Sequence, residues 1–128
     1  IITITASHAA SRLAEHVSPG THIACMGTDT AGKQEVSAEL LTKARVFCDE
    51  RAQSTSIGEA QHAVAQGLIE ADAITELGAV INGTAPGRVA ADDITLFDGT
   101  GVGLQDLAVA DAVLQGAIAA SIAGEVDG

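Results

Sequence analysis

The chain has 128 residues, which is enough for one domain with a modest core. It carries 17 acidic against 6 basic side chains, a formal net charge of −11, which disfavours nucleic-acid phosphates and anionic membrane surfaces as partners. Hydrophobic residues make up 47% and aromatic residues only 2%, which excludes a disordered tail and predicts a core of aliphatic side chains.

The first half of the chain predicts strands that alternate with helices. The segment from residue 22 to 27 is apolar with little alternation, which is typical of a strand buried on both faces. In chain order we expect a strand at 1–6, a short helical or irregular segment at 7–14, a strand at 22–27, a helix at 33–44 and a strand at 45–48.

The second half continues the same pattern. We expect a loop at 54–58, a helix at 59–66, an apolar segment of ambiguous type at 75–81, a turn at 82–87, a strand at 94–97 and a long helix at 104–122 closed by Gly124. Strands that alternate with helices predict an α/β fold with a parallel sheet flanked by helices.

Cysteine usage and the two ends of the chain bear on where the protein works. Cys25 and Cys48 each lie in an apolar run, which indicates buried, reduced thiols and a cytoplasmic location. The sequence shows neither a secretory signal nor an apolar run of membrane-spanning length. The chain begins inside an apolar strand rather than with Met, so we expect a fragment whose first strands are absent.

Asp29 is the first candidate for a functional residue. It follows the predicted strand at 22–27, and the carboxyl ends of parallel strands are where open α/β sheets hold ligands. The alternative is that Asp29 only caps the helix predicted to follow it. Lys33 lies near the start of that helix, where a cation is unfavourable for the helix dipole, which favours a partner outside the helix.

The loop after the strand at 94–97 contains Gly99, Gly101 and Gly103. Its spacing is close to the dinucleotide fingerprint, but the third glycine comes one residue early and no acidic ribose partner follows at the usual distance. A pyrophosphate loop and a loop of small residues that lets a backbone approach closely both remain open. The histidines have no metal-ligand spacing, so we expect no metal site.

Several stretches resemble the ornithine cyclodeaminase/mu-crystallin family in their order and spacing. The most specific are residues 22–35 (HIACMGTDTAGKQE) and 94–107 (ITLFDGTGVGLQDL). Shorter ones are residues 44–49 (ARVFCD), 58–59, 76–78 and 87–88, and together they cover almost the whole chain.

The resemblance implies that residues 1–128 form a single partial NAD(P)-binding domain of the Rossmann type, with 104–122 as a long closing helix. It implies that Asp29 is the catalytic acid/base, that Gly101 contacts the substrate, and that the cofactor, NAD or NADP, contacts Thr5, Met26, Gly27, Thr28, Asp29, Lys33 and Thr100. The family's glycine-rich fingerprint and the substrate-binding Arg and Lys of its amino-terminal domain would lie before Ile1.

Two functions follow as expectations. The resemblance implies part of an NAD(P)-dependent cyclodeaminase, amino-acid dehydrogenase or imine reductase. Such an enzyme transfers hydride at an amine-bearing carbon of a small amino acid or cyclic imine, and we expect a homo-oligomer. The alternative is a non-catalytic α/β module that associates with itself or a partner chain, because an exposed strand edge invites pairing.

Overall fold

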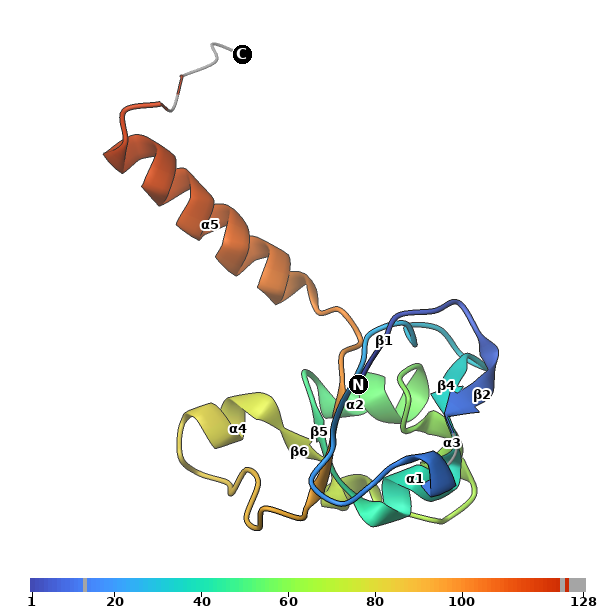
Figure 1. Ribbon diagram of the computed structural model, residues 1–128. Helices are drawn as coiled ribbons and strands as arrows, with labels where there is room; N and C mark the ends of the chain where they lie inside the picture. Colours follow the sequence, from blue (N-terminus) through green and yellow to red (C-terminus); the bar gives the residue numbers. More distant parts are fainter. Residues whose placement is uncertain (13, 123, 125–128) are drawn as a thin grey trace.

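The computed structural model describes residues 1–12, 14–122 and 124. A five-stranded parallel sheet lies at its centre, in the strand order β1-β3-β7-β5-β6 (Figure 1). Its strands are β1 (Ile2–Thr3), β3 (His22–Cys25), β5 (Ala44–Cys48), β6 (Thr75–Glu76) and β7 (Ile94–Asp98). The predicted α/β class with a parallel sheet is therefore confirmed.

Helices flank this sheet and follow its strands along the chain. The α-helices are α1 (Ala38–Lys43), α2 (Arg51–Ser56), α3 (Gln61–Ala65), α4 (Leu77–Ile81) and α5 (Gly103–Ala119). Two 3-10 turns, η1 (Ala14–His16) and η2 (Ala71–Ala73), connect the elements. Leu40, Leu41 and Ala63 from α1 and α3 pack against the sheet in one hydrophobic core.

Helices bury one face of the sheet, whereas the other face is partly exposed. Ile23 of β3 and Val46 of β5 lie beside Leu96 of β7 in the register, and all three are buried under the helices. On the opposite face, His22 is exposed, and the outermost strand leaves Ile2 77% exposed. Because side chains alternate along a strand, the prediction that β3 is buried on both faces is wrong: only the helix-covered face is fully buried.

A second sheet holds two segments that sequence patterns placed wrongly. Residues 8–12, expected to be helical or irregular, form β2 (His8–Arg12). It pairs in parallel with β4 (Gln34–Val36), which occupies the start of the helix predicted at 33–44. The Gln34 N–H donates to Ser7 O and the Ser37 N–H to Arg12 O, so pairing between distant segments overrides local propensity.

Two further differences have local causes. Residues 54–56, expected to be a loop, belong to α2, because the Glu50 carboxylate accepts hydrogen bonds from the N–H groups of Ala52 and Gln53 and caps a helix there. The ambiguous segment at 75–81 divides into the short strand β6 and the helix α4. The strands at 45–48 and 94–97 and the middle of the helix at 59–66 are confirmed.

Helix α5 projects away from the body of the molecule (Figure 1). It ends at Ala119, and the backbone leaves the helix through Ala120 and Ser121, well before Gly124. None of its residues is buried. The apolar side chains that it leaves exposed are Leu104, Leu107, Val109, Val113, Leu114 and Ile118.

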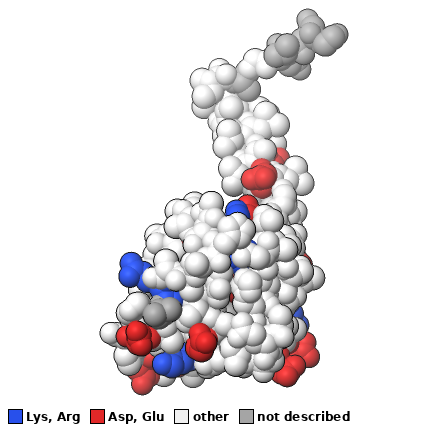
Figure 2. All heavy atoms as spheres, turned by 90° about the vertical axis from the view of Figure 1, so that its right-hand side faces the viewer, with Lys and Arg blue, Asp and Glu red and all other residues white. Residues whose placement is uncertain are grey.

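Charged side chains are scattered over the body of the molecule. On the face drawn in Figure 2, acidic and basic groups lie close to one another along the lower part of the body, whereas the middle of the face and most of α5 are uncharged. Among the residues that the structure describes, no helix has the length and apolar character needed to cross a membrane.

Candidate functional site

The carboxyl ends of β1, β3 and β7 meet at one edge of the sheet. Thr3 lies beside Cys25, and Cys25 lies beside Asp98 in the register, so the loops that follow these strands begin next to one another. The Gly99 N–H donates to Cys25 O at 2.9 Å, which ties the third loop to the second strand. This edge is where open parallel sheets bind ligands.

Asp29 lies in the loop after β3 and forms an ion pair with Lys33. The Lys33 Nζ lies 2.6 Å from Asp29 Oδ1, and the side chain of Asp29 is 58% exposed. The hydrogen bond from Lys33, followed by one from Thr30, holds the pKa of Asp29 below its usual value. Asp29 is therefore an accessible carboxylate that is ionised at neutral pH.

Asp29 is not a helix cap, which was the alternative left open by the sequence. The next helix, α1, begins at Ala38 and has Ser37 as its N-cap residue. Lys33 likewise lies before a strand rather than at a helix start, because β4 begins at Gln34. The partner of Lys33 is the Asp29 carboxylate, and its Nζ also lies 3.5 Å from Gly27 O.

Thr5 and Gly27 lie against one another at the ends of β1 and β3. A Cβ atom at Gly27 would lie 2.3 Å from Thr5 O and 2.7 Å from the Glu35 Oε1 atom, so only glycine fits there. Met26 is 42% exposed, and its Sδ lies where a side chain at Gly99 would have to go.

The side chain of Thr28 points inward rather than toward the edge. It is 1% exposed, and its hydroxyl donates to the Glu59 carboxylate at 2.5 Å. The residue as a whole is buried, so Thr28 can act on a ligand at this edge only by supporting its neighbours in the loop. Glu35 and Glu59 accept hydrogen bonds from Gly27 and Thr28 in the interior of the protein. Neither was among the predicted site residues, because the sequence pattern placed them in the helices expected at 33–44 and 59–66.

Asp49 holds the loop that contains Thr100 and Gly101. Its carboxylate, at the end of β5, accepts hydrogen bonds from the N–H groups of Thr100 and Gly101 at 2.9 Å and from the Thr100 hydroxyl at 2.8 Å. Gly101 has a φ of 79°, a conformation that favours glycine. Because the Asp49 carboxylate already accepts hydrogen bonds from these N–H groups, they are not free to bind a pyrophosphate. This favours the other alternative, a loop of small residues that lets a backbone approach closely.

Asp98 is a further buried acid near this edge, on the helix-covered face. The Ser54 hydroxyl donates to Asp98 Oδ2 at 2.6 Å, while Oδ1 is buried without a hydrogen-bond partner among the described residues. Burial is the main cause that raises the pKa of Asp98 to about 6. Its side chain is fully buried, so it is not accessible to a ligand at the edge.

Three potential metal ligands come together that sequence spacing did not predict. Ligand atoms of Cys25, Glu35 and Glu59 lie within 4.8 Å of one another, and all three residues are buried. Burial raises the pKa of the Cys25 thiol, which keeps it protonated. The carboxylate oxygens already accept hydrogen bonds from backbone N–H and threonine hydroxyl groups, so the cluster lacks free donor atoms for an ion.

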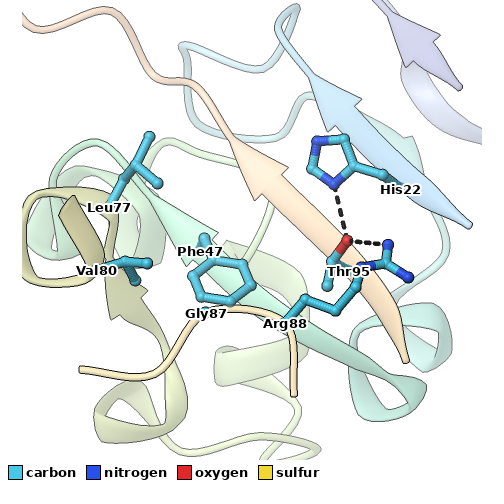
Figure 3. A pocket seen from close by; sticks show the side chains of 7 residues that line it. All are labelled: His22, Phe47, Leu77, Val80, Gly87, Arg88 and Thr95. Carbon is cyan, nitrogen blue, oxygen red and sulfur yellow. Dashed lines mark hydrogen bonds between the residues drawn. The ribbon is translucent and has the colours of Figure 1, made fainter. Parts of the chain in front are cut away.

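A hollow of about 320 Å³ lies away from this edge, on the less covered face of the sheet. His22 and Arg88 approach the hydroxyl of Thr95 at its rim, at 2.8 and 2.9 Å (Figure 3). The remaining lining residues are Phe47, Leu77, Val80 and Gly87. None of the predicted site residues lines it, and Arg88 also donates to Gly20 O, so this pocket is separate from the chemistry predicted for Asp29.

Comparisons with known proteins agree on what this chain is similar to. The model of the ornithine cyclodeaminase/mu-crystallin family matches residues 1–120. The iminosuccinate reductase of Paracoccus denitrificans is 57% identical over 127 residues, which are 99% of this chain and 39% of that protein.

Solved structures give the same result. The crystal structure of the Paracoccus denitrificans iminosuccinate reductase in complex with NAD+ matches with a TM-score of 0.93 over 99% of this chain. The structure of an archaeal alanine dehydrogenase dimer with bound NAD matches at 37% identity with a TM-score of 0.89, covering 98% of this chain and 40% of that one. The chain thus spans about two fifths of the length of these relatives.

Proposed function

The chain belongs to the ornithine cyclodeaminase/mu-crystallin family, and from this premise we propose that it forms the nicotinamide side of an NAD(P)-dependent enzyme of amino-acid metabolism. The proposed reaction is hydride transfer at an amine-bearing or imine carbon of a small amino acid or cyclic imine. Relatives solved with NAD+ or NAD support NAD as the cofactor.

The observation that carries this proposal is the exposed carboxylate of Asp29 in the loop after β3, a strand whose carboxyl end lies beside that of β7. The missing side chain at Gly27 lets the backbone at the end of β3 lie directly against Thr5 at the end of β1, which brings these two strand ends together at the candidate site. The residues present suit the nicotinamide end of the cofactor, whereas the loop at 99–103 is occupied by Asp49 and does not suit the pyrophosphate.

When bound, the nicotinamide cofactor supplies or accepts the hydride. The chain's own part is to move a proton: Asp29, ionised beside Lys33, accepts a proton from the substrate nitrogen or from water and returns it in the opposite direction. Lys33 keeps Asp29 charged between turnovers. Thr5, Met26, Gly27, Thr28 and Thr100 line or support the cofactor side of the same edge, and Gly101 the substrate side.

The first test is binding of NADH to a protein that contains this chain, because we do not expect the 128 residues to bind the cofactor alone; binding is followed by the fluorescence of the reduced nicotinamide, with the molecular mass measured alongside. We expect saturable binding in the micromolar range. A stable dimer that binds neither NAD+ nor NADH would contradict the proposal.

The second test is Asp29→Asn in a protein that contains this chain and reduces an imine with NADH. We expect turnover to fall about 10²-fold or more, because general acid–base catalysis typically contributes about 10²–10⁴-fold. The dissociation constant for NADH should change little, because the amide has the size of the carboxylate. Asp92→Asn, an exposed acid elsewhere, is the control. Unchanged turnover would show that Asp29 does not transfer the proton.

A second function, self-association, is supported by a different observation. Helix α5 exposes apolar side chains all round, and such a helix is normally buried. We propose that α5 contributes to a homo-oligomer.

The two free cysteines, Cys25 and Cys48, are buried, and this supports a reducing cytoplasm as the proposed location of the protein.

A further inference from the structure

We propose that Glu35 and Glu59 are positioning residues, which hold Thr5, Gly27 and Thr28 in place at the carboxyl edge of the sheet. This inference rests on the function proposed above, because these three residues form the cofactor side of the candidate site. Neither glutamate touches the surface: their exposed fractions are 0% and 1%.

Glu35, on β4, binds two loops at once. Its Oε1 accepts hydrogen bonds from the Thr5 N–H at 2.6 Å and the Thr5 hydroxyl at 2.9 Å. Its Oε2 accepts from the Thr3 hydroxyl and from the Gly27 N–H, both at 2.9 Å. One carboxylate therefore joins the end of β1 to the end of β3, which are adjacent strands of the sheet.

The close contact between Gly27 and Thr5 explains why a carboxylate is needed there. The two backbones approach so closely that the N–H groups of Thr5 and Gly27 both donate to the carboxylate of Glu35. A carboxylate is an acceptor only, so it satisfies every one of these donors. An amide in its place would turn an NH₂ group toward donors on one side, leaving them unpaired in a buried place.

Glu59, in the loop before α3, supports Thr28, the residue that follows Gly27. It accepts hydrogen bonds from the N–H groups of Glu35 and Val36 at 2.9 and 2.7 Å, and from the Thr28 hydroxyl. Burial raises the pKa of Glu59, and the bonds from Thr28 and from the backbone partly offset that rise. Because Thr28 directly precedes Asp29, Glu59 fixes the base of the loop that carries the exposed carboxylate.

The two acids form one continuous support. Glu59 holds the backbone of Glu35, and Glu35 holds Thr5 and Gly27. A change in either acid moves the loop that carries Asp29 without touching Asp29 itself. The expected consequence is weaker binding of nicotinamide in a chain whose hydrophobic core remains folded.

Amide hydrogen exchange tests the support directly. The Thr5 and Gly27 N–H groups are protected by Glu35, and the Glu35 and Val36 N–H groups by Glu59. In Glu35→Gln we expect exchange at Thr5 and Gly27 to accelerate about tenfold or more, with the core amide of Leu96 unchanged. In Glu59→Gln the accelerated amides should be those of residues 35 and 36.

Matched variants separate positioning from packing. Glu39→Gln removes a charge of the same kind from an exposed site on α1 and should change neither exchange nor binding. Glu35→Asp keeps an acceptor-only carboxylate in a smaller side chain, so it should restore part of the protection that Glu35→Gln loses. If Glu35 acted only by packing, Glu35→Gln would keep more protection than Glu35→Asp, because Gln has the same shape as Glu.

Titration with NADH completes the test. Relative to Glu39→Gln, we expect Glu35→Gln to bind NADH about tenfold more weakly and Glu35→Asp to recover part of that loss. Protected Thr5 and Gly27 amides in Glu35→Gln, or unchanged NADH affinity once they are exposed, would overturn the positioning role. If an unmodified protein that contains this chain does not bind NADH, the proposed function fails instead, and the exchange data still decide whether the two acids hold the edge.

Discussion

At the scale of single residues, the carboxylates of this chain have very different surroundings. Asp29 is exposed and paired with Lys33, whereas Asp98 is buried without a cation among its hydrogen-bond partners in the described chain. The pKa of the first is lowered and that of the second is raised. Side chains of one type therefore divide into an accessible base and a buried acid, because their environments differ.

The pair of Lys33 and Asp29 yields a prediction about titration. Replacing Lys33 with Gln should raise the pKa of Asp29 toward its usual value, because the hydrogen bond and the charge of Lys33 are the leading cause of its depression. The pKa is read from the carboxyl chemical shift of Asp29 as a function of pH. Lys43→Gln, which removes an exposed charge from the end of α1, is the control and should leave that pKa unchanged. Identical titration curves for both variants would refute the pairing.

Asp98 yields a prediction about stability and pH. Its folded pKa of about 6 lies above the usual 3.8, so the folded state binds the proton more tightly than the unfolded state. The free energy of unfolding should therefore fall as pH rises from about 4 to about 6, and the loss is complete above that range. The difference corresponds to roughly 3 kcal/mol at most.

Asp98→Asn removes this titration, so the stability of the variant relative to the unmodified chain should improve as pH rises from 4 to 7. Urea unfolding at several pH values measures it. Asp92→Asn, an exposed acid, should follow the unmodified chain throughout. Parallel pH dependences for Asp98→Asn and the unmodified chain would mean that Asp98 has an ordinary pKa.

At the scale of elements, local sequence succeeded where a segment carries its own signal. The strands β5 and β7 and the helix α3 are where their apolar patterns place them. The short strands β2 and β4 have no such apolar pattern. They form because they pair with each other and because the N–H groups of β4 donate to the Glu59 carboxylate. Only the folded chain brings those partners together.

Helix α5 yields a prediction about association. The double variant L107Q/L114Q removes two apolar side chains that are 65% and 52% exposed, without changing the charge. We expect it to reduce the self-association of the chain while the melting temperature of the body stays the same, because α5 buries nothing against that body. Sedimentation velocity measures the association, and Ile81→Gln, a change of the same kind at a 76% exposed position on α4, is the control. A monomeric parent chain at high concentration would contradict this prediction.

At the scale of the whole molecule, one face of the sheet is covered and the other is only partly so. Helices α1 and α3 and the buried aliphatic residues complete one core, while Ile2 and Ile4, in and just after β1, remain 77% and 74% exposed. The chain also spans about two fifths of its relatives. These two facts are consistent with the expected partial cofactor domain, and the candidate site that we propose lies at the edge where β1, β3 and β7 end together.

By itself, the sequence determined the α/β class, the parallel sheet, the family and the position of Asp29 after a strand, because the order of apolar segments and motifs along the chain is enough to predict each of them. Only the tertiary structure decided that Lys33 pairs with Asp29 before a strand, that Asp49 fills the loop at Thr100, and that Glu35 and Glu59 lie beneath Gly27 and Thr28. A buried carboxylate takes its role from donors that lie far away in the sequence. The folded backbone alone brings those donors within hydrogen-bond distance.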